Sequence, residues 1–201
     1  MRQRVAPRII FDPPYVCRGI PLFNDRGEID FIDMVKISVR NNPVSRLGGI
    51  EARDAYAIVE FKAIDENNWA LKMQYPRWVQ NPKPRADEVP AGTVPKFKHQ
   101  MNFRTLSPNN AQNILDIALK HVGKADPYIF GFQGSSQELP GWKNGDFRLL
   151  GNKWIVEVKI DGTNIDDPVT YKFILINHGA NKHPEIISFE IYESINWIGI
   201  G

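Results

Sequence analysis

Cations and aromatic rings gather in one short stretch of this 201-residue chain, "LKMQYPRWVQNPKPR", which spans residues 71–85. Rings beside lysine or arginine can stack on a nucleobase or a sugar ring. They can equally dock a partner protein, because tryptophan, tyrosine and arginine carry much of the binding energy at protein interfaces. The candidate binding residues are Lys72, Tyr75, Arg77, Trp78, Lys83 and Arg85, with Lys96, Lys98 and Arg104 as further positive charge nearby.

A purely structural interpretation of this stretch is also open. Tyr75 and Trp78 could pin a proline-rich loop to the body of the domain, since each ring buries a large apolar area. The sequence does not decide between a loop that binds a ligand and a loop that its own rings hold in place.

The histidines lie at spacings that favour structural roles. His178 and His183 are five residues apart, whereas a zinc-binding helix places histidines at i and i+4, and a zinc finger also needs paired cysteines. A turn between two strands is therefore the preferred interpretation of "NHGANKH". His99 falls in the inward phase of its stretch, which is typical of a hydrogen-bonded histidine in the core or at its edge.

The acidic residues Asp161, Asp166 and Asp167 could gather oxygen ligands for calcium, as the loops of some sandwiches do. Their spacing is not that of an EF-hand, so a solvated hairpin is preferred. Asp161-Gly162 is also a turn signal, and Asn41 is expected to close a strand by bonding its own backbone. No metal and no other cofactor is predicted.

Signatures of catalysis are missing from the sequence. It has no Gly-x-Ser-x-Gly elbow and no Rossmann fingerprint, and no P-loop lysine follows "GFQGSSQ" at 131–137. The single cysteine, Cys17, excludes an intramolecular disulfide and is interpreted as a small buried hydrophobe rather than a nucleophile. The chain is predicted not to be an enzyme.

Composition narrows the classes of partner. The apolar share of 42% is too high for a disordered chain, and the net charge of +2 gives no concentrated basic footprint for nucleic acid. No stretch reaches the roughly 18 apolar residues of a membrane span. The start of the chain lacks an apolar region of signal-peptide length, and with one cysteine this slightly favours a soluble, cytoplasmic protein while the compartment stays open.

Alternation with a period of two dominates the chain and predicts strands. Two irregular segments interrupt it: 76–95 holds five prolines, and 131–151 holds five glycines. The pattern predicts a single all-β domain over 1–201, with a core of about 30–193 and loops at 76–95 and 131–151. The expected strands are "DMVKISVR" (33–40), "DAYAIVEFKA" (54–63), "KFKHQMNFR" (96–104), "KWIVEVKID" (153–161), "VTYKFILIN" (169–177) and "EIISFEIYE" (185–193). Trp69 and Trp154 are expected to anchor the core or its edge.

The stretch "LSPNNAQNILDIALKHVGKAD" (106–126) fits either a helix or a strand. As a helix it has Ser107 as N-cap, Pro108 as its first residue and Gly123 beyond its end. As a strand it alternates Leu115, Ile117 and Leu119 with more polar or smaller neighbours.

Several landmarks resemble immunoglobulin-like β-sandwich domains of the CARDB type, which occur in prokaryotic proteins. These are "VKISVRNN" followed by Ala52 and "AYAIVEF", then "LSPNNAQNILDIAL", then "KWIVEVKIDGTNIDDPVTYKFIL". The similarity covers residues 33–176 and implies an immunoglobulin-like antiparallel sandwich with two long loop insertions. It favours the strand for 106–126, because long-range pairing commonly overrides helix propensity.

A sandwich that carries long loops predicts a non-catalytic binding or interaction module, whose partner is another protein or a second copy of the chain. Two alternatives are kept. One is a sensor for an anionic small molecule such as a nucleotide, and the other is a structural subunit of a virion or surface assembly.

Overall fold

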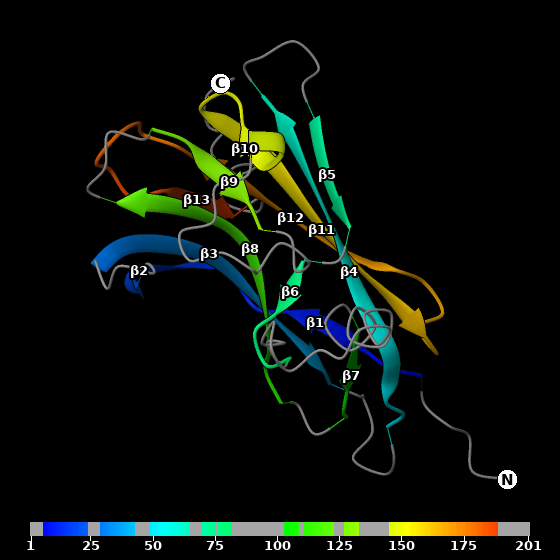
Figure 1. Ribbon diagram of the computed structural model, residues 1–201. Coiled ribbons are helices and arrows are strands. Elements are labelled where there is room, and N and C mark those ends of the chain that lie inside the picture. Colours follow the sequence, from blue (N-terminus) through cyan, green and yellow to red (C-terminus); the bar gives the residue numbers. More distant parts are fainter. Residues whose placement is uncertain are drawn as a thin grey trace, which may run out of the picture.

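The computed structural model describes residues 6–23, 29–42, 49–64, 70–74, 76–81, 103–108, 111–122, 127–132 and 145–188 (Figure 1). Within these ranges the chain is built of strands, with one short 3-10 turn and no α-helix. The elements are β1 (Ile9–Phe11), β2 (Tyr15–Phe23), β3 (Ile29–Asn41), β4 (Ala52–Ala63), β5 (Ala70–Gln74), β6 (Arg77–Trp78), β7 (Arg104–Leu106), β8 (Asn113–Val122), β9 (Ile129–Gly131), η3 (Gly145–Phe147), β10 (Arg148–Leu149), β11 (Lys153–Thr163), β12 (Val169–Ile176) and β13 (Glu185–Ser188).

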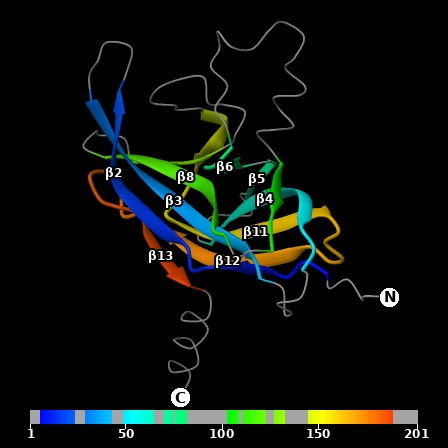
Figure 2. The same ribbon diagram turned by 90° about the horizontal axis from the view of Figure 1, so that it is seen from below.

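The strands form two antiparallel sheets that pack face to face (Figure 2). The first sheet has the order β1-β3-β8-β9-β10, with β2 also paired to β3 and β6 to β8. The second sheet has the order β13-β12-β11-β4-β5, with β7 also paired to β4. The all-β sandwich predicted from the alternating pattern is confirmed.

One hydrophobic core joins the two sheets, and the predicted alternation places its residues. From the first sheet it takes Val35, Ile37 and Val39 of β3, all fully buried. Because successive side chains of a strand point to opposite faces, the intervening residues of β3 face outward. The second sheet contributes the fully buried Ala55, Ala57, Val59 and Phe61 of β4 and Trp154, Val156, Val158 and Ile160 of β11.

The ambiguous stretch at 106–126 contains a strand, as the family resemblance favoured. β8 lies between β3 and β9, and nearly all of its residues are buried. A strand buried on both faces needs a nearly continuous apolar run, and such a run also fits a helix, which explains the ambiguity. A bulge opposite Val35 and Lys36 sends both Ile117 and Ala118 into the core.

Asn41 joins three segments that are distant in the sequence. Its Nδ2 donates to the carbonyl oxygens of Ile50 (2.8 Å) and Leu106 (3.0 Å), and its Oδ1 accepts from the amide of Arg8 (3.1 Å). The sequence predicted a local turn bond for this residue and gave no sign of these long-range bonds. A buried amide needs all its hydrogen-bond partners, so Asn41 holds the end of β3 against the segments that contain Arg8, Ile50 and Leu106.

The polar turn expected from Asp161-Gly162 onward begins at Gly162, whose carbonyl oxygen accepts from the amide of Ile165 at 3.3 Å. β11 continues to Thr163, and the positive φ of 71° falls on Asn164. At Gly162 a Cβ atom would lie 2.9 Å from both Ala55 Cα and the Arg53 carbonyl oxygen. Glycine therefore serves here to let β4 approach closely, at the bulge between Asp161 and Thr163.

The two irregular segments each contribute a short strand to the first sheet. β6 begins the 76–95 segment and pairs with β8, and β10 near the end of 131–151 pairs with β9. Trp69, His99 and most of the strand expected at 96–104 lie outside the described residues.

Candidate functional site

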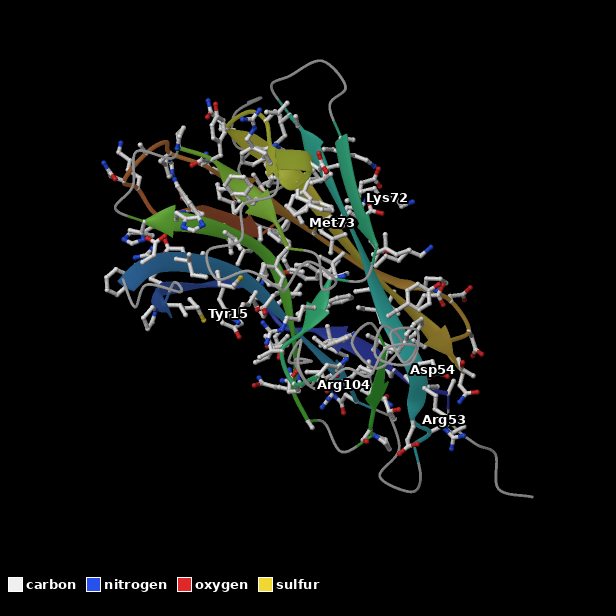
Figure 3. All side chains as sticks on the ribbon, in the orientation of Figure 1. Tyr15, Arg53, Asp54, Lys72, Met73 and Arg104 are labelled. Carbon is white, nitrogen blue, oxygen red and sulfur yellow. The ribbon has the colours of Figure 1, made fainter. Side chains whose placement is uncertain are left out.

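The predicted binding stretch at 71–85 is divided between the two sheets. Lys72 is exposed on β5 of the second sheet, where its register partner is Glu60 (Figure 3). Arg77 and Trp78 form β6 of the first sheet. Tyr75, Lys83, Arg85, Lys96 and Lys98 lie outside the described residues.

Trp78 is fully buried in the common core, so it anchors β6, as in the interpretation of a loop held by its rings. Its neighbour Arg77 faces away from the core, 3.8 Å from Oδ2 of Asp116. The other oxygen of Asp116 accepts from Lys36 Nζ at 2.6 Å. Burial lowers the pKa of Arg77, and the charge of Asp116 partly opposes this shift.

Arg104 is also engaged in structural bonds. Its Nε donates to Asn113 Oδ1 (2.9 Å) and its Nη1 to Asn81 Oδ1 (3.1 Å). Among the described members of this group, only Lys72 has a largely solvent-exposed side chain that lacks such structural bonds.

A different set of residues surrounds a hollow of about 600 Å³ between β2 and β13. Each of these strands lies at an edge: within the described residues β2 pairs only with β3, and β13 only with β12. Figures 1 and 2 show the two strands on the same side of the sandwich. The lining residues are Pro14, Tyr15, Val16, Arg18, His178, His183, Pro184, Glu185 and Ile186.

One buried carboxylate holds both walls of this hollow. Asp33 is fully buried; its Oδ1 accepts from the amide of Gly19 on β2 (3.0 Å), and its Oδ2 lies 2.6 Å from His183 Nδ1. A bulge lets Arg18 and Gly19 stand opposite Asp33, and Gly19 has a φ of +63°, which glycine adopts without strain. Asp33 thus fixes the backbone beside Arg18 and the ring of His183.

The contact with Asp33 also sets the chemistry of His183. A carboxylate accepts hydrogen bonds, so Nδ1 carries the shared proton and Nε2 is left to face other groups. The side chain is 45% exposed, and His183 lines the hollow. Asp33 fixes the orientation of this imidazole. Carboxylates orient metal-bound histidines in the same way, by accepting a hydrogen bond from the ring nitrogen that does not bind the metal.

A buried lysine anchors the loop that carries the two histidines. Lys120 is the register partner of Asp33 and is 1% exposed. Its Nζ donates to Asn177 Oδ1 and to the carbonyl oxygen of Gly179, both at 2.6 Å. Asn177 Nδ2 in turn donates to the carbonyl oxygen of Pro127 (2.6 Å). A buried ammonium requires such partners, so the loop between β12 and β13 is tied to the first sheet.

The remaining polar side chains that line the hollow are those of His178, Glu185 and Arg18. His178 Nε2 lies 2.6 Å from Glu185 Oε2, and both side chains are exposed. Arg18 forms no ion pair with any other residue in the described ranges.

The histidine pair behaves as the connection between strands that its spacing predicted, since 177–184 joins β12 to β13. Within the described part of the chain, no three His, Cys, Asp or Glu side chains come together as metal ligands. Asp161 accepts from the hydroxyl of Tyr56 (3.1 Å), while Asp166 and Asp167 are exposed. No helix in the described ranges is long and apolar enough to cross a membrane.

The sequence held a signal for this site that its strand pattern obscured. Asp33 has the inward phase of Val35, and Lys120 occupies the register position opposite Asp33. Charged residues in inward positions are rare unless they are paired, so they mark a buried polar network.

Comparisons with models of known families, with curated proteins and with solved structures give no match to this chain. The resemblance to immunoglobulin-like domains of the CARDB type is therefore still a prediction, while the sandwich itself stands on the structure.

Proposed function

We propose that the chain is a non-catalytic interaction module that binds an extended segment of a partner protein at the hollow between β2 and β13. The observation that carries this proposal is the position of the hollow between two edge strands. An edge strand presents backbone donors and acceptors that an incoming peptide can pair with, and adjacent pockets then select its side chains.

The lining suits such a partner. Tyr15, Val16 and Ile186 offer apolar contact, while Arg18 and His183 offer a few placed polar groups. This mixture is typical of recognition sites, and a volume of about 600 Å³ lies within the usual range of ligand pockets. Because Asp33 holds both walls before any ligand arrives, binding loses little free energy to ordering the site.

Selection from a phage-displayed library of random peptides tests the proposal. Peptides enriched on the full chain would be synthesised and their affinities measured by fluorescence anisotropy. Tyr15 and Tyr128 are both 37% exposed, which makes them a matched pair. We expect Tyr15→Ala to weaken binding about tenfold, because aromatic anchors dominate interfaces, and Tyr128→Ala to change it less than about twofold. Equal effects of the two substitutions, or no enriched peptide, would reject the proposed function.

A sensor for an anionic small molecule is the second candidate, and the presence of Arg18 and His183 in one lining favours it. If the chain is such a sensor, at least one nucleotide of a panel should raise the midpoint of thermal unfolding of the wild-type chain, since a ligand that binds only the folded state stabilises it. The rise should disappear in Arg18→Gln. A midpoint that no nucleotide moves would eliminate nucleotides as the ligand.

A further inference from the structure

We infer that the hollow between β2 and β13 recognises a single carboxylate, held by the guanidinium of Arg18 and by Nε2 of His183. The inference rests on the proposed function for its physiological source, an acidic side chain or a chain terminus of the bound peptide. It adds the chemical group that the site selects.

The charge balance of the hollow singles out Arg18. Glu185 is paired with His178 at 2.6 Å, and Asp33 is bonded to His183 and lies opposite Lys120 in the β3–β8 register. Arg18, exposed and without an ion pair among the described residues, is the cation that a ligand can reach. A guanidinium presents a planar fork of donors that matches a carboxylate in two parallel hydrogen bonds.

His183 supplies the second contact. Its Nδ1 is occupied by Asp33 at 2.6 Å, so Nε2 is the ring atom that a ligand meets. In the bound state Nε2–H donates to the ligand, and Asp33 lies against the other ring nitrogen as the balancing anion. Asp33 also bonds the amide of Gly19, next to Arg18, so one carboxylate positions both contacts.

The size of the charge argues for a carboxylate rather than a polyphosphate. A nucleoside triphosphate would bring several negative charges to a site where Arg18 is the cation without an ion pair among the described residues, close to the carboxylates of Glu185 and Asp33. A carboxylate brings one, which Arg18 neutralises. The hollow therefore selects against nucleotides while accepting an acidic peptide.

Analogues of the peptides enriched on the full chain test the inference directly. Each acidic side chain and the terminal carboxylate would be replaced, one at a time, by the amide. In the wild-type chain we expect one replacement to weaken binding about tenfold, and in Arg18→Gln the same replacement should cost less than about twofold. Arg53→Gln, at an exposed arginine on β4, is the matched control and should keep the wild-type discrimination. If no single carboxylate matters, or if discrimination survives in Arg18→Gln, the inference is overturned.

A second arm keeps the inference testable if the proposed function fails. N-acetylglycine, N-acetylglycinamide and inorganic phosphate would be titrated into the full chain while the ring resonances of His183 are followed by NMR. We expect a saturable shift with N-acetylglycine, which carries one carboxylate, that N-acetylglycinamide does not give and that Arg18→Gln removes. Equal shifts with the acid and the amide, or tighter binding of phosphate than of the acid, would overturn the choice of a carboxylate.

Discussion

The two ends of β3 use the same inward-facing positions for different purposes. Val35, Ile37 and Val39 point into the apolar core and hold the two sheets together. Two residues before Val35, Asp33 shares their phase but carries a charge, and it bonds the walls of the hollow instead. Burying a charge costs free energy, whereas burying an apolar side chain does not. Asp33 therefore lowers the stability of the fold while it fixes the positions of Gly19 and His183.

Substitution of a core residue of β3 should give the largest loss of stability. Ile37 is fully buried, and Ile37→Ala should lower the free energy of unfolding by about 3 kcal/mol, from lost burial and the cavity left behind. Urea denaturation measures the change. Phe31→Ala, at an exposed aromatic residue of the same strand, is the control and should cost less than about 1 kcal/mol. Similar losses at both positions would show that the core is not where the structure places it.

Substitution of Asp33 should lower the free energy of unfolding by less than the core substitution. It should also weaken protection at one nearby amide, which the core substitution should not do. Asp33→Asn removes the charge but keeps the size of the side chain, and should cost about 2 kcal/mol because His183 and Lys120 lose their carboxylate neighbour. Hydrogen exchange at the amide of Gly19 should speed up selectively, since its acceptor is weakened. Asp167→Asn, at an exposed carboxylate, should leave both measurements unchanged. Uniform acceleration throughout the sheet would mean that Asp33 serves only the general stability of the fold.

Backbone contact at the far end of β11 offers a third, smaller test. Gly162→Ala should cost about 1–2 kcal/mol, because the new Cβ would meet the β4 backbone at 2.9 Å and one strand must shift. Gly145→Ala is its control, since a Cβ there meets nothing within 4 Å. Thermal denaturation of the two variants gives the comparison. The ring resonances of His183 should stay unchanged in both variants. A change in Gly162→Ala would show that a shift of β4 against β11 alters the structure of the hollow.

The exposed pair at the hollow should matter least for folding. Glu185→Gln should alter the free energy of unfolding by less than about 0.5 kcal/mol, because exposed ion pairs are screened by water and salt. Chemical denaturation at low and at 0.5 M salt checks this. A loss of more than about 1 kcal/mol would show that the pair supports the loop between β12 and β13.

The fold could largely be predicted from the sequence because alternation is a local signal. Ala55 to Phe61 of β4 and Trp154 to Ile160 of β11 follow it at every second residue, so their burial could be predicted position by position. The strand within 106–126 could not be predicted from alternation alone, because β8 is buried on both faces and its apolar run has no clear period. Gly162 was predicted as a turn residue, but its close approach to β4 was not, because that contact depends on a strand far away in the sequence.

The candidate site could not be predicted in the same way. Residues 71–85 attracted attention because cations and rings are adjacent in the chain, yet pairing puts Lys72 and Arg77 in different sheets and Trp78 in the core. The hollow unites residues about 150 positions apart, as the bond between Asp33 and His183 shows. The packing of one sheet on the other brings these two residues together, and that packing is not visible in a local sequence pattern.

The tautomer of His183 is the most direct measurement of whether Asp33 holds both walls of the hollow. A long-range ¹H–¹⁵N correlation spectrum of the full chain, recorded at a pH where the ring is neutral, identifies the protonated ring nitrogen. We expect the proton on Nδ1, together with a slowly exchanging amide at Gly19, and we expect both features to be lost in Asp33→Ala. A proton on Nε2, or an unchanged spectrum and unchanged exchange in Asp33→Ala, would contradict the account.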